Sequence, residues 1–107
     1  MFNFVNYPEN GLHKIYYEDG KLKEKVNYKN GKLEGSHERY YENGQLWSQV
    51  NYKNGKPDGL SEVYHESGQL ILRNNYKNGK LDGLSEWFNA EGKLHMKANY
   101  KNGRKVK

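Results

Sequence analysis

The chain contains the stretch Tyr28-Lys29-Asn30-Gly31-Lys32, and its first four letters return at residues 52–55, 76–79 and 100–103. The period is 24 residues. Asn and Gly both tolerate positive φ, so Asn-Gly between short alternating runs is among the strongest signals of a β-hairpin. The stretch therefore predicts one chain reversal in every period of a repeat protein.

A second reversal signal falls inside each period, as in Glu42-Asn43-Gly44-Gln45. Between the two signals lie short segments rich in Tyr, Val, Ile and Trp, as strands prefer. Both signals predict three-residue loops, a type I turn followed by a Gly in a G1 bulge. We expect an all-β fold: tandem antiparallel β-hairpin repeats that form one elongated, twisted meander sheet. A single domain over 1–107 would hold repeats at about 4–27, 28–51, 52–75 and 76–99 and a partial repeat at 100–107.

Composition agrees with a thin sheet that has a shallow core. Only 34% of the 107 residues are hydrophobic, 29% are charged, and 10 are Tyr. The formal net charge of +5 favours acidic partners weakly. No cysteine, apolar membrane span or signal-peptide pattern is present. We expect a cytoplasmic protein, although a leader removed beforehand would leave no trace in the sequence.

Three-residue loops assign the side chains to two faces, because strand side chains alternate. They place Tyr40 opposite Leu46 on one face and Arg39 opposite Trp47 on the other. The first face is expected to be a core ladder of cross-strand pairs. Its members are Tyr16/Leu22, Tyr40/Leu46, Tyr64/Leu70 and Phe88/Leu94, with Leu12, Val26, Val50, Leu60, Leu84 and Ala98, and with Tyr28, Tyr52 and Tyr76 along the edge.

The second face varies between repeats, and we expect individual function there. Its central pairs are Ile15/Lys23, Arg39/Trp47, Val63/Ile71 and Trp87/His95, beside Lys25, Gln49, Arg73, Lys97, His13 and His37. Exposed Trp together with Arg is typical of interface anchors. The residues expected to contact a partner are Arg39, Trp47, Val63, Ile71, Arg73, Trp87 and His95. The alternative is that they pack against a sister molecule or merely stiffen the sheet.

Catalytic and metal chemistry are not expected. His13 and His37 share a column two strands apart, which is about 9–10 Å, whereas zinc ligands lie about 2.0–2.3 Å from the metal. Glu38, Glu62 and Glu86 are likewise separated by whole hairpins and resemble a solvated row. No serine has a recognisable His–Asp partner. We therefore expect no enzyme activity, no cofactor and no metal.

The stretch Asn30-Gly31-Lys32-Leu33-Glu34-Gly35, an aromatic residue, Gly-x-Leu and the next Tyr-x-Asn-Gly-Lys resemble the MORN repeat. The likeness covers nearly the whole chain and is closest to the variant form common in bacterial proteins. Ordinary MORN repeats carry a second Gly two residues after the Gly35 position, where His37, Ser61 and Ser85 stand here. The resemblance implies successive antiparallel hairpins in an elongated, curved sheet.

For function the resemblance implies an interaction segment. Some bacterial variant-repeat proteins are described as antitoxins or immunity partners of secreted toxins. Others carry a kinase label taken from plant enzymes, which we reject because the chain has no phosphate-binding loop of either familiar kind.

Three functions stay open at this stage. The first is a non-catalytic protein-binding scaffold, of which a toxin-neutralising antitoxin or immunity partner is one form. The second is attachment to an anionic lipid or membrane surface through Lys25, Arg73 and Lys97, with nucleic acid as a weaker version that lacks any binding motif. The third is self-association to a homo-oligomer through a sheet edge or face, for which residues 2–5 offer an unprotected edge.

Overall fold

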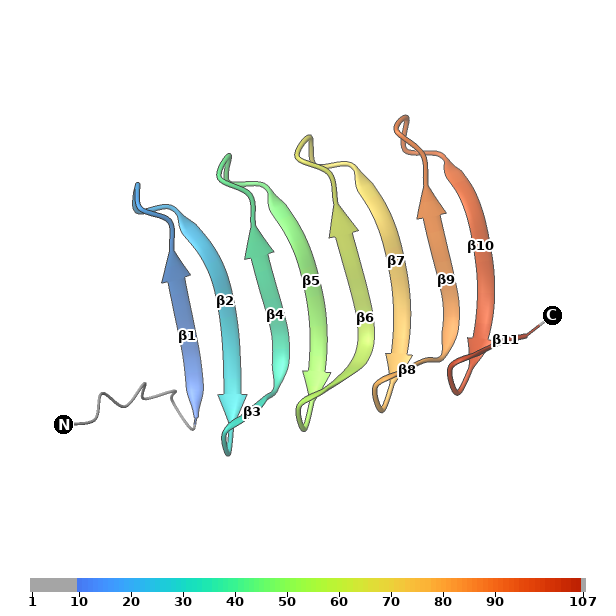
Figure 1. Cartoon of the computed structure of the whole chain (residues 1–107), viewed down its shortest axis with the longest axis horizontal. Coiled ribbons are helices and arrows are strands. Elements are labelled where there is room, and N and C mark those ends of the chain that lie inside the picture. Colours follow the sequence, from blue (N-terminus) through green and yellow to red (C-terminus); the bar gives the residue numbers. More distant parts are fainter. Residues whose placement is uncertain (1–9, 107) are drawn as a thin grey trace.

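The computed structural model describes residues 10–106, which form one open antiparallel sheet (Figure 1). Its long dimension is 56 Å, against 32 and 21 Å for the other two. The strands are β1 (Gly11–Tyr16), β2 (Leu22–Lys29), β3 (Lys32–Leu33), β4 (Gly35–Tyr40), β5 (Leu46–Lys53), β6 (Lys56–Tyr64), β7 (Leu70–Lys77), β8 (Lys80–Leu81), β9 (Gly83–Phe88), β10 (Leu94–Lys101) and β11 (Arg104–Val106). This confirms the hairpin meander expected from the repeat.

Strands follow one another across the sheet in chain order. The path runs β1-β2-β4-β5-β6-β7-β9-β10-β11, while the short β3 and β8 pair with β2 and β7. The strands β1 and β11 therefore lie at opposite ends of the long axis (Figure 1). The edge expected at residues 2–5 lies outside the described residues.

The turn between Glu42 and Gly44 has the geometry expected from its sequence. The Gly44 N–H donates to the Tyr41 carbonyl at 2.9 Å, and the Tyr41 N–H donates to the Gln45 carbonyl at 2.9 Å. Gly44 has a φ of 90°, which its missing side chain permits. The loop is therefore a three-residue type I turn closed by a Gly bulge, as predicted.

The Asn-Gly turn differs from the prediction. Lys29 pairs directly with Lys32, so only Asn30 and Gly31 form the loop. Both have positive φ, 52° and 78°, which defines a two-residue type I′ turn. The three-residue prediction is wrong for this turn because Asn and Gly can both occupy the left-handed region, and the two-residue turn matches the strand twist.

A β-bulge follows every three-residue loop. Tyr40 pairs with Leu46 as predicted, but Arg39 pairs with Ser48 instead of Trp47. Trp47 is the extra residue of the bulge, and the same shift recurs in the other repeats. The extra residues are Lys23, Trp47, Ile71 and His95. One inserted residue moves every later side chain of the same strand to the opposite side of the sheet. The predicted assignment of residues to the two faces is therefore partly wrong.

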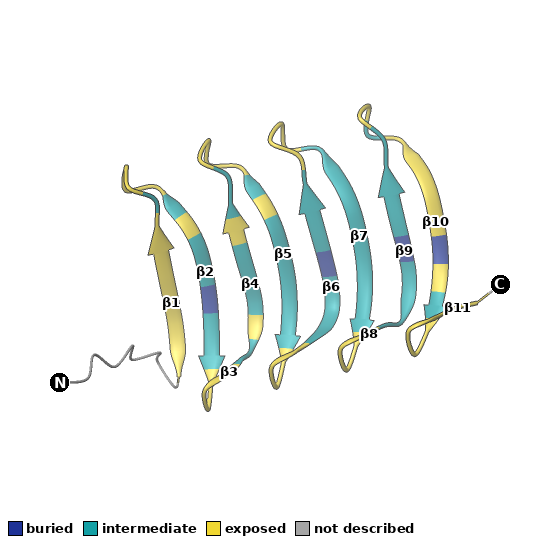
Figure 2. Cartoon of the chain, viewed as in Figure 1, coloured by how far each residue is buried: buried dark blue, intermediate teal, exposed yellow. Residues whose placement is uncertain are grey.

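The reversal moves the middle of the predicted core to the other side of the sheet. Val26 pairs with His13, whereas Leu12 pairs with Asn27. Val26, Val50 and Ala98 therefore face away from the Tyr–Leu pairs, and so do Tyr28, Tyr52 and Tyr76. The strand register places the buried residues Val26, Ser61, Ser85 and Ala98 on this side. Figure 2 shows the buried positions near the middle of their strands.

Successive Asn-Gly turns are hydrogen-bonded to each other. The Gly55 N–H donates to the Leu33 carbonyl of the preceding turn at 2.9 Å. The Asn54 N–H donates to Oε1 of Glu34 at 3.0 Å. The same two bonds recur one and two periods later, with Asp58 and Asp82 as the carboxylate acceptors. The repeats are thus joined along this edge as well as through the sheet.

Asn78 offers a test of the two-residue turn, since its φ is 52°. Replacing Asn78 by Ala should lower the free energy of unfolding by about 1 kcal/mol, because an alanine pays the steric cost of the left-handed region. Asn78→Gly is the matched control and should change stability much less. Urea unfolding followed by tyrosine fluorescence measures both. Equal stability of the two variants would contradict the type I′ assignment.

Candidate interaction surface

We call the side of the sheet that carries Arg39 and Trp47 the tryptophan face. The Arg39 guanidinium lies 5.7 Å from the Trp47 ring centre, within the range of a cation–π contact. The Trp47 and Tyr41 ring centres are 5.9 Å apart. Trp47 remains 40% exposed although it has these neighbours. Because of the bulge, the Trp47 ring has no cross-strand partner and stays exposed, whereas in a regular strand it would lie opposite a residue of β4.

The strand register carries this face along the whole sheet. Arg39 pairs with Ser48, Ser48 with Val63, and Val63 with Leu72. Leu72 pairs in turn with Trp87, and Trp87 with Met96. The predicted residues Val63 and Trp87 therefore share a side with Arg39. Leu72 and Met96 belong to the same row and were missed, because only the bulge brings them there.

Ile71 and His95 hold the bulge position in the last two hairpins, equivalent to that of Trp47. Ile71 lines a pocket between the third and fourth hairpins together with His65 and Phe88. His95 is exposed on β10, as is Met96. Four neighbouring repeats thus present a different side chain at one equivalent place, namely Lys23, Trp47, Ile71 and His95.

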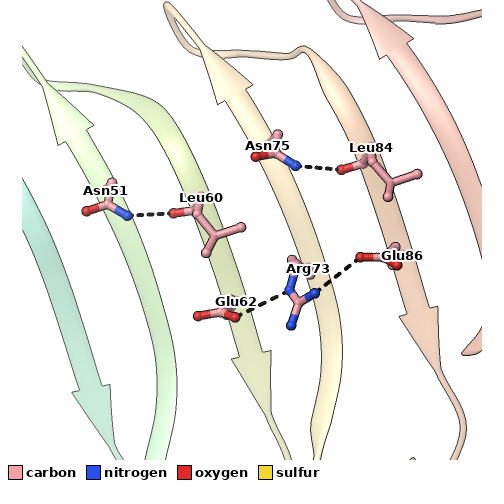
Figure 3. Close-up of polar contacts among 7 residues, drawn as sticks. All are labelled: Asn51, Leu60, Glu62, Arg73, Asn75, Leu84 and Glu86. Carbon is pink, nitrogen blue, oxygen red and sulfur yellow. Dashed lines mark hydrogen bonds and ion pairs between the residues drawn. The ribbon is translucent and has the colours of Figure 1, made fainter. Parts of the chain in front are cut away.

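Arg73 lies on the opposite side of the sheet, so its predicted position is wrong. Its Nε is 3.4 Å from Oε2 of Glu62, and its Nη1 is 3.5 Å from Oε1 of Glu86 (Figure 3). Lys25 forms an equivalent pair with Glu38 at 3.4 Å. The bulge shift explains the error, since it moves the Lys25, Gln49, Arg73 and Lys97 column to the side of the Tyr–Leu pairs. Two of these cations are neutralised there by glutamates.

One histidine, His37, forms a pairwise contact with a carboxylate. Nε2 of His37 bonds to the Glu24 carboxylate, which also lies 3.6 Å from Nε of Arg39. Within residues 10–106, no three His, Cys, Asp or Glu side chains are grouped so that they could hold a metal ion.

Tyrosine side chains tie neighbouring hairpins together at the three-residue loops. The Tyr17 hydroxyl donates to the Tyr40 carbonyl, and the Tyr41 hydroxyl donates to the Tyr64 carbonyl, each at 2.6 Å. Burial raises the pKa of Tyr41, and the nearby Glu66 carboxylate raises it further. The neutral hydroxyl is therefore the form that the folded state favours.

The opposite long edge of the sheet is basic, because cations flank every Asn-Gly turn. We call the set of eight the basic edge: Lys29, Lys32, Lys53, Lys56, Lys77, Lys80, Lys101 and Arg104. All eight are exposed, and in the described part of the chain none forms an ion pair. A β-carbon built on Gly55 would lie 3.7 Å from Cβ of Lys32, so the lysine stem lies across the next turn. The repeat thereby sets these charges in a row.

Comparison with known proteins identifies the repeat. A family model described as MORN repeat variant matches residues 9–30, 33–54, 57–78 and 81–102. The chain belongs to the MORN repeat variant family. MORN repeats are non-enzymatic modules that typically mediate interactions with proteins or membranes, and the kinase label finds no support in this match.

Other comparisons add little. No curated protein matches the MORN-variant chain. One similar solved structure is titled "Crystal structure of accessory secretory protein 1,2 and 3 in Streptococcus pneumoniae". The two share 15% sequence identity with a TM-score of 0.48, over 92% of this chain and 19% of that chain. In residues 10–106 no helix is long and apolar enough to cross a membrane.

The tyrosine contact predicts a pH dependence. A tyrosine whose pKa is higher in the folded than in the unfolded state stabilises the fold while its hydroxyl is neutral. This stabilisation is fully present below the unfolded-state pKa of about 10, and it is lost as the pH rises through the folded-state pKa. Tyr41→Phe should lower the free energy of unfolding at pH 8 by about 1 kcal/mol, the worth of a typical hydrogen bond. The difference in the free energy of unfolding between Tyr41→Phe and wild type should become smaller as the pH rises above 10.

Urea unfolding at a series of pH values measures this gap. Tyr16→Phe is the matched control, because this side chain is 55% exposed and its hydroxyl forms no side-chain hydrogen bond within the described residues. A gap for Tyr41→Phe that stays constant to pH 11 would contradict the proposed role of the neutral hydroxyl.

Proposed function

We propose that this MORN-variant chain is a non-catalytic scaffold that binds another protein through its tryptophan face. The observation that carries the proposal is the cluster of exposed Trp47 and Arg39 with half-buried Tyr41, in which a bulge sets Trp47 out from the sheet. Trp, Tyr and Arg are the residue types that dominate binding energy at protein interfaces. A continuous row from Val63 through Leu72 and Trp87 to Met96 would extend the contact.

The finer proposal is an antitoxin or immunity-type partner of a bacterial toxin. It rests on the description of some bacterial variant-repeat proteins in this way. An open sheet with apolar and charged groups side by side suits such a role, because a protein inhibitor needs a broad complementary surface. Co-expression with the product of the neighbouring gene tests it. Rescue of growth by the wild-type chain is expected if that product is toxic.

The tryptophan face predicts the result of a binding experiment. Trp47→Ala/Trp87→Ala should weaken partner capture by roughly tenfold or more, since tryptophan anchors are typical hot spots. Leu12→Ala/Leu94→Ala is the matched control, because both leucines are exposed, at 52% and 46%, on the other side of the sheet. Quantitative pull-downs with wild type and both variants give the comparison. If both variants recover the same proteins as wild type, the tryptophan face is not the anchor.

A second candidate function is attachment to an anionic lipid surface. The column of Lys25, Arg73 and Lys97 supports lipid attachment less than the sequence suggested, because Lys25 and Arg73 form ion pairs with glutamates. The basic edge supports it better, since eight exposed cations follow one edge of the sheet. Such a row could contact a charged plane along its whole length.

Vesicles of acidic phospholipid test this candidate. Replacing Lys53, Lys56, Lys77 and Lys80 by Gln should abolish binding at low ionic strength, because each lysine near the surface contributes about 1 kcal/mol. The same replacement at Lys21, Lys23, Lys93 and Lys97 removes equal charge away from the basic edge and should matter much less. Co-sedimentation at several salt concentrations measures both sets. If both sets of replacements weaken vesicle binding equally, net charge alone explains the binding and the basic edge has no special role.

A further inference from the structure

The column that contains Tyr17 and Tyr41 changes in the third hairpin. At these two positions a tyrosine reaches across to the next repeat and donates to its backbone carbonyl. The equivalent position in the third hairpin is His65, whose ring is shorter. Nδ1 of His65 accepts a hydrogen bond from the Ser67 N–H at 3.3 Å, which holds the ring at its own turn. The bridge to the next repeat is therefore missing here.

A pocket of about 320 Å³ lies where that bridge would run. Its lining residues come from two hairpins: His65, Ser67, Gln69, Ile71, Phe88, Asn89 and Ala90. Ile71, Phe88 and Ala90 supply apolar surface. The polar lining is partly engaged, since Oδ1 of Asn89 accepts from the N–H groups of Glu91 and Lys93. The volume is at the lower end of ligand sites, enough for a single ring.

The pocket also retains the acceptor that a tyrosine would use. Tyr40 and Tyr64 accept the hydroxyl hydrogen bonds through their backbone carbonyls, and Phe88 is the equivalent residue one repeat on. Within residues 10–106, no side chain donates to the Phe88 carbonyl. A carbonyl accepts and cannot donate, so a ligand here needs a hydrogen-bond donor and not an ionised carboxylate. In the two preceding repeats this donor is a tyrosine hydroxyl.

We propose that this pocket binds a phenol group supplied from outside the chain, with its ring against Ile71 and its hydroxyl donating to the Phe88 carbonyl. The occupant repeats what Tyr17 and Tyr41 do within the chain. This inference deepens the proposed function and rests on it in one respect: a tyrosine of the bound protein is then the natural source. A small phenolic molecule offers the same chemistry.

The experiment is a titration of the ¹⁵N-labelled chain with p-cresol, with toluene as the matched probe that lacks the hydroxyl. Amide shifts should centre on His65, Ile71 and residues 88–90. The p-cresol dissociation constant should be roughly threefold to tenfold below that of toluene, as expected for one net hydrogen bond. N-acetyltyrosinamide forms the third arm. Its binding assigns the site to a polypeptide tyrosine, and binding of p-cresol alone assigns it to a small phenol.

Two variants complete the test. His65→Tyr should fill the pocket from within and reduce p-cresol affinity at least tenfold. Tyr41→His should open an equivalent pocket one repeat earlier and raise the number of p-cresol sites from one to two. Each variant is checked for folding by its amide spectrum.

Equal affinity for toluene and p-cresol would overturn the proposal, and so would shifts centred away from the pocket. Both results come from the wild-type chain and hold even if a variant fails to fold. Failure here is distinct from failure of the tryptophan face, because the Trp47→Ala/Trp87→Ala protein retains every lining residue. That double variant should bind p-cresol as wild type does, whatever its partner capture.

Discussion

Backbone N–H groups of the Asn-Gly turns at 54–55, 78–79 and 102–103 donate to the turn before, and the stacking of hairpins depends on this contact. Within the sheet, two of the junctions between repeats are interrupted ladders. β2 shares two residue pairs with β3 and two with β4, and β7 likewise shares two with β8 and two with β9. The turn contacts, such as Gly55 to Leu33, support the junction at one edge. The Tyr17 and Tyr41 hydroxyls support it at the other.

The fold could be predicted because its determinants are local. Glycine adopts positive φ because it has no side chain, whatever surrounds it. The three-residue loop then pairs Tyr40 with Leu46 without help from distant contacts. The bulge at Trp47 could not be read in this way. It inserts one residue into a strand without a glycine or proline to mark it, and Lys, Trp, Ile and His all occupy the position. Sequence alternation alone therefore assigned the following residues, Arg73 among them, to the wrong side.

Variation in this MORN-variant chain gathers around the same bulge. The extra residue has no cross-strand partner, so its identity is free of the pairing that constrains its neighbours. The column that contains Tyr17 and Tyr41 also tolerates a change of residue. His65 stands there in the third hairpin, and the register of β6 and β7 is undisturbed. Turn residues and Tyr–Leu pairs, in contrast, repeat almost unchanged. Variable side chains and repeated side chains are thus separated into different columns of the sheet.

The order of strands along the sheet also governs how the chain acquires its structure. Each strand in residues 10–106 is hydrogen-bonded only to strands close to it in the sequence, so contact order is low and little loop-closure entropy opposes folding. A nucleus can form at any hairpin and grow in both directions, as in one-dimensional repeat arrays. The terminal strand β1 is exposed at every residue, so the described array would fray from its ends before its centre opens.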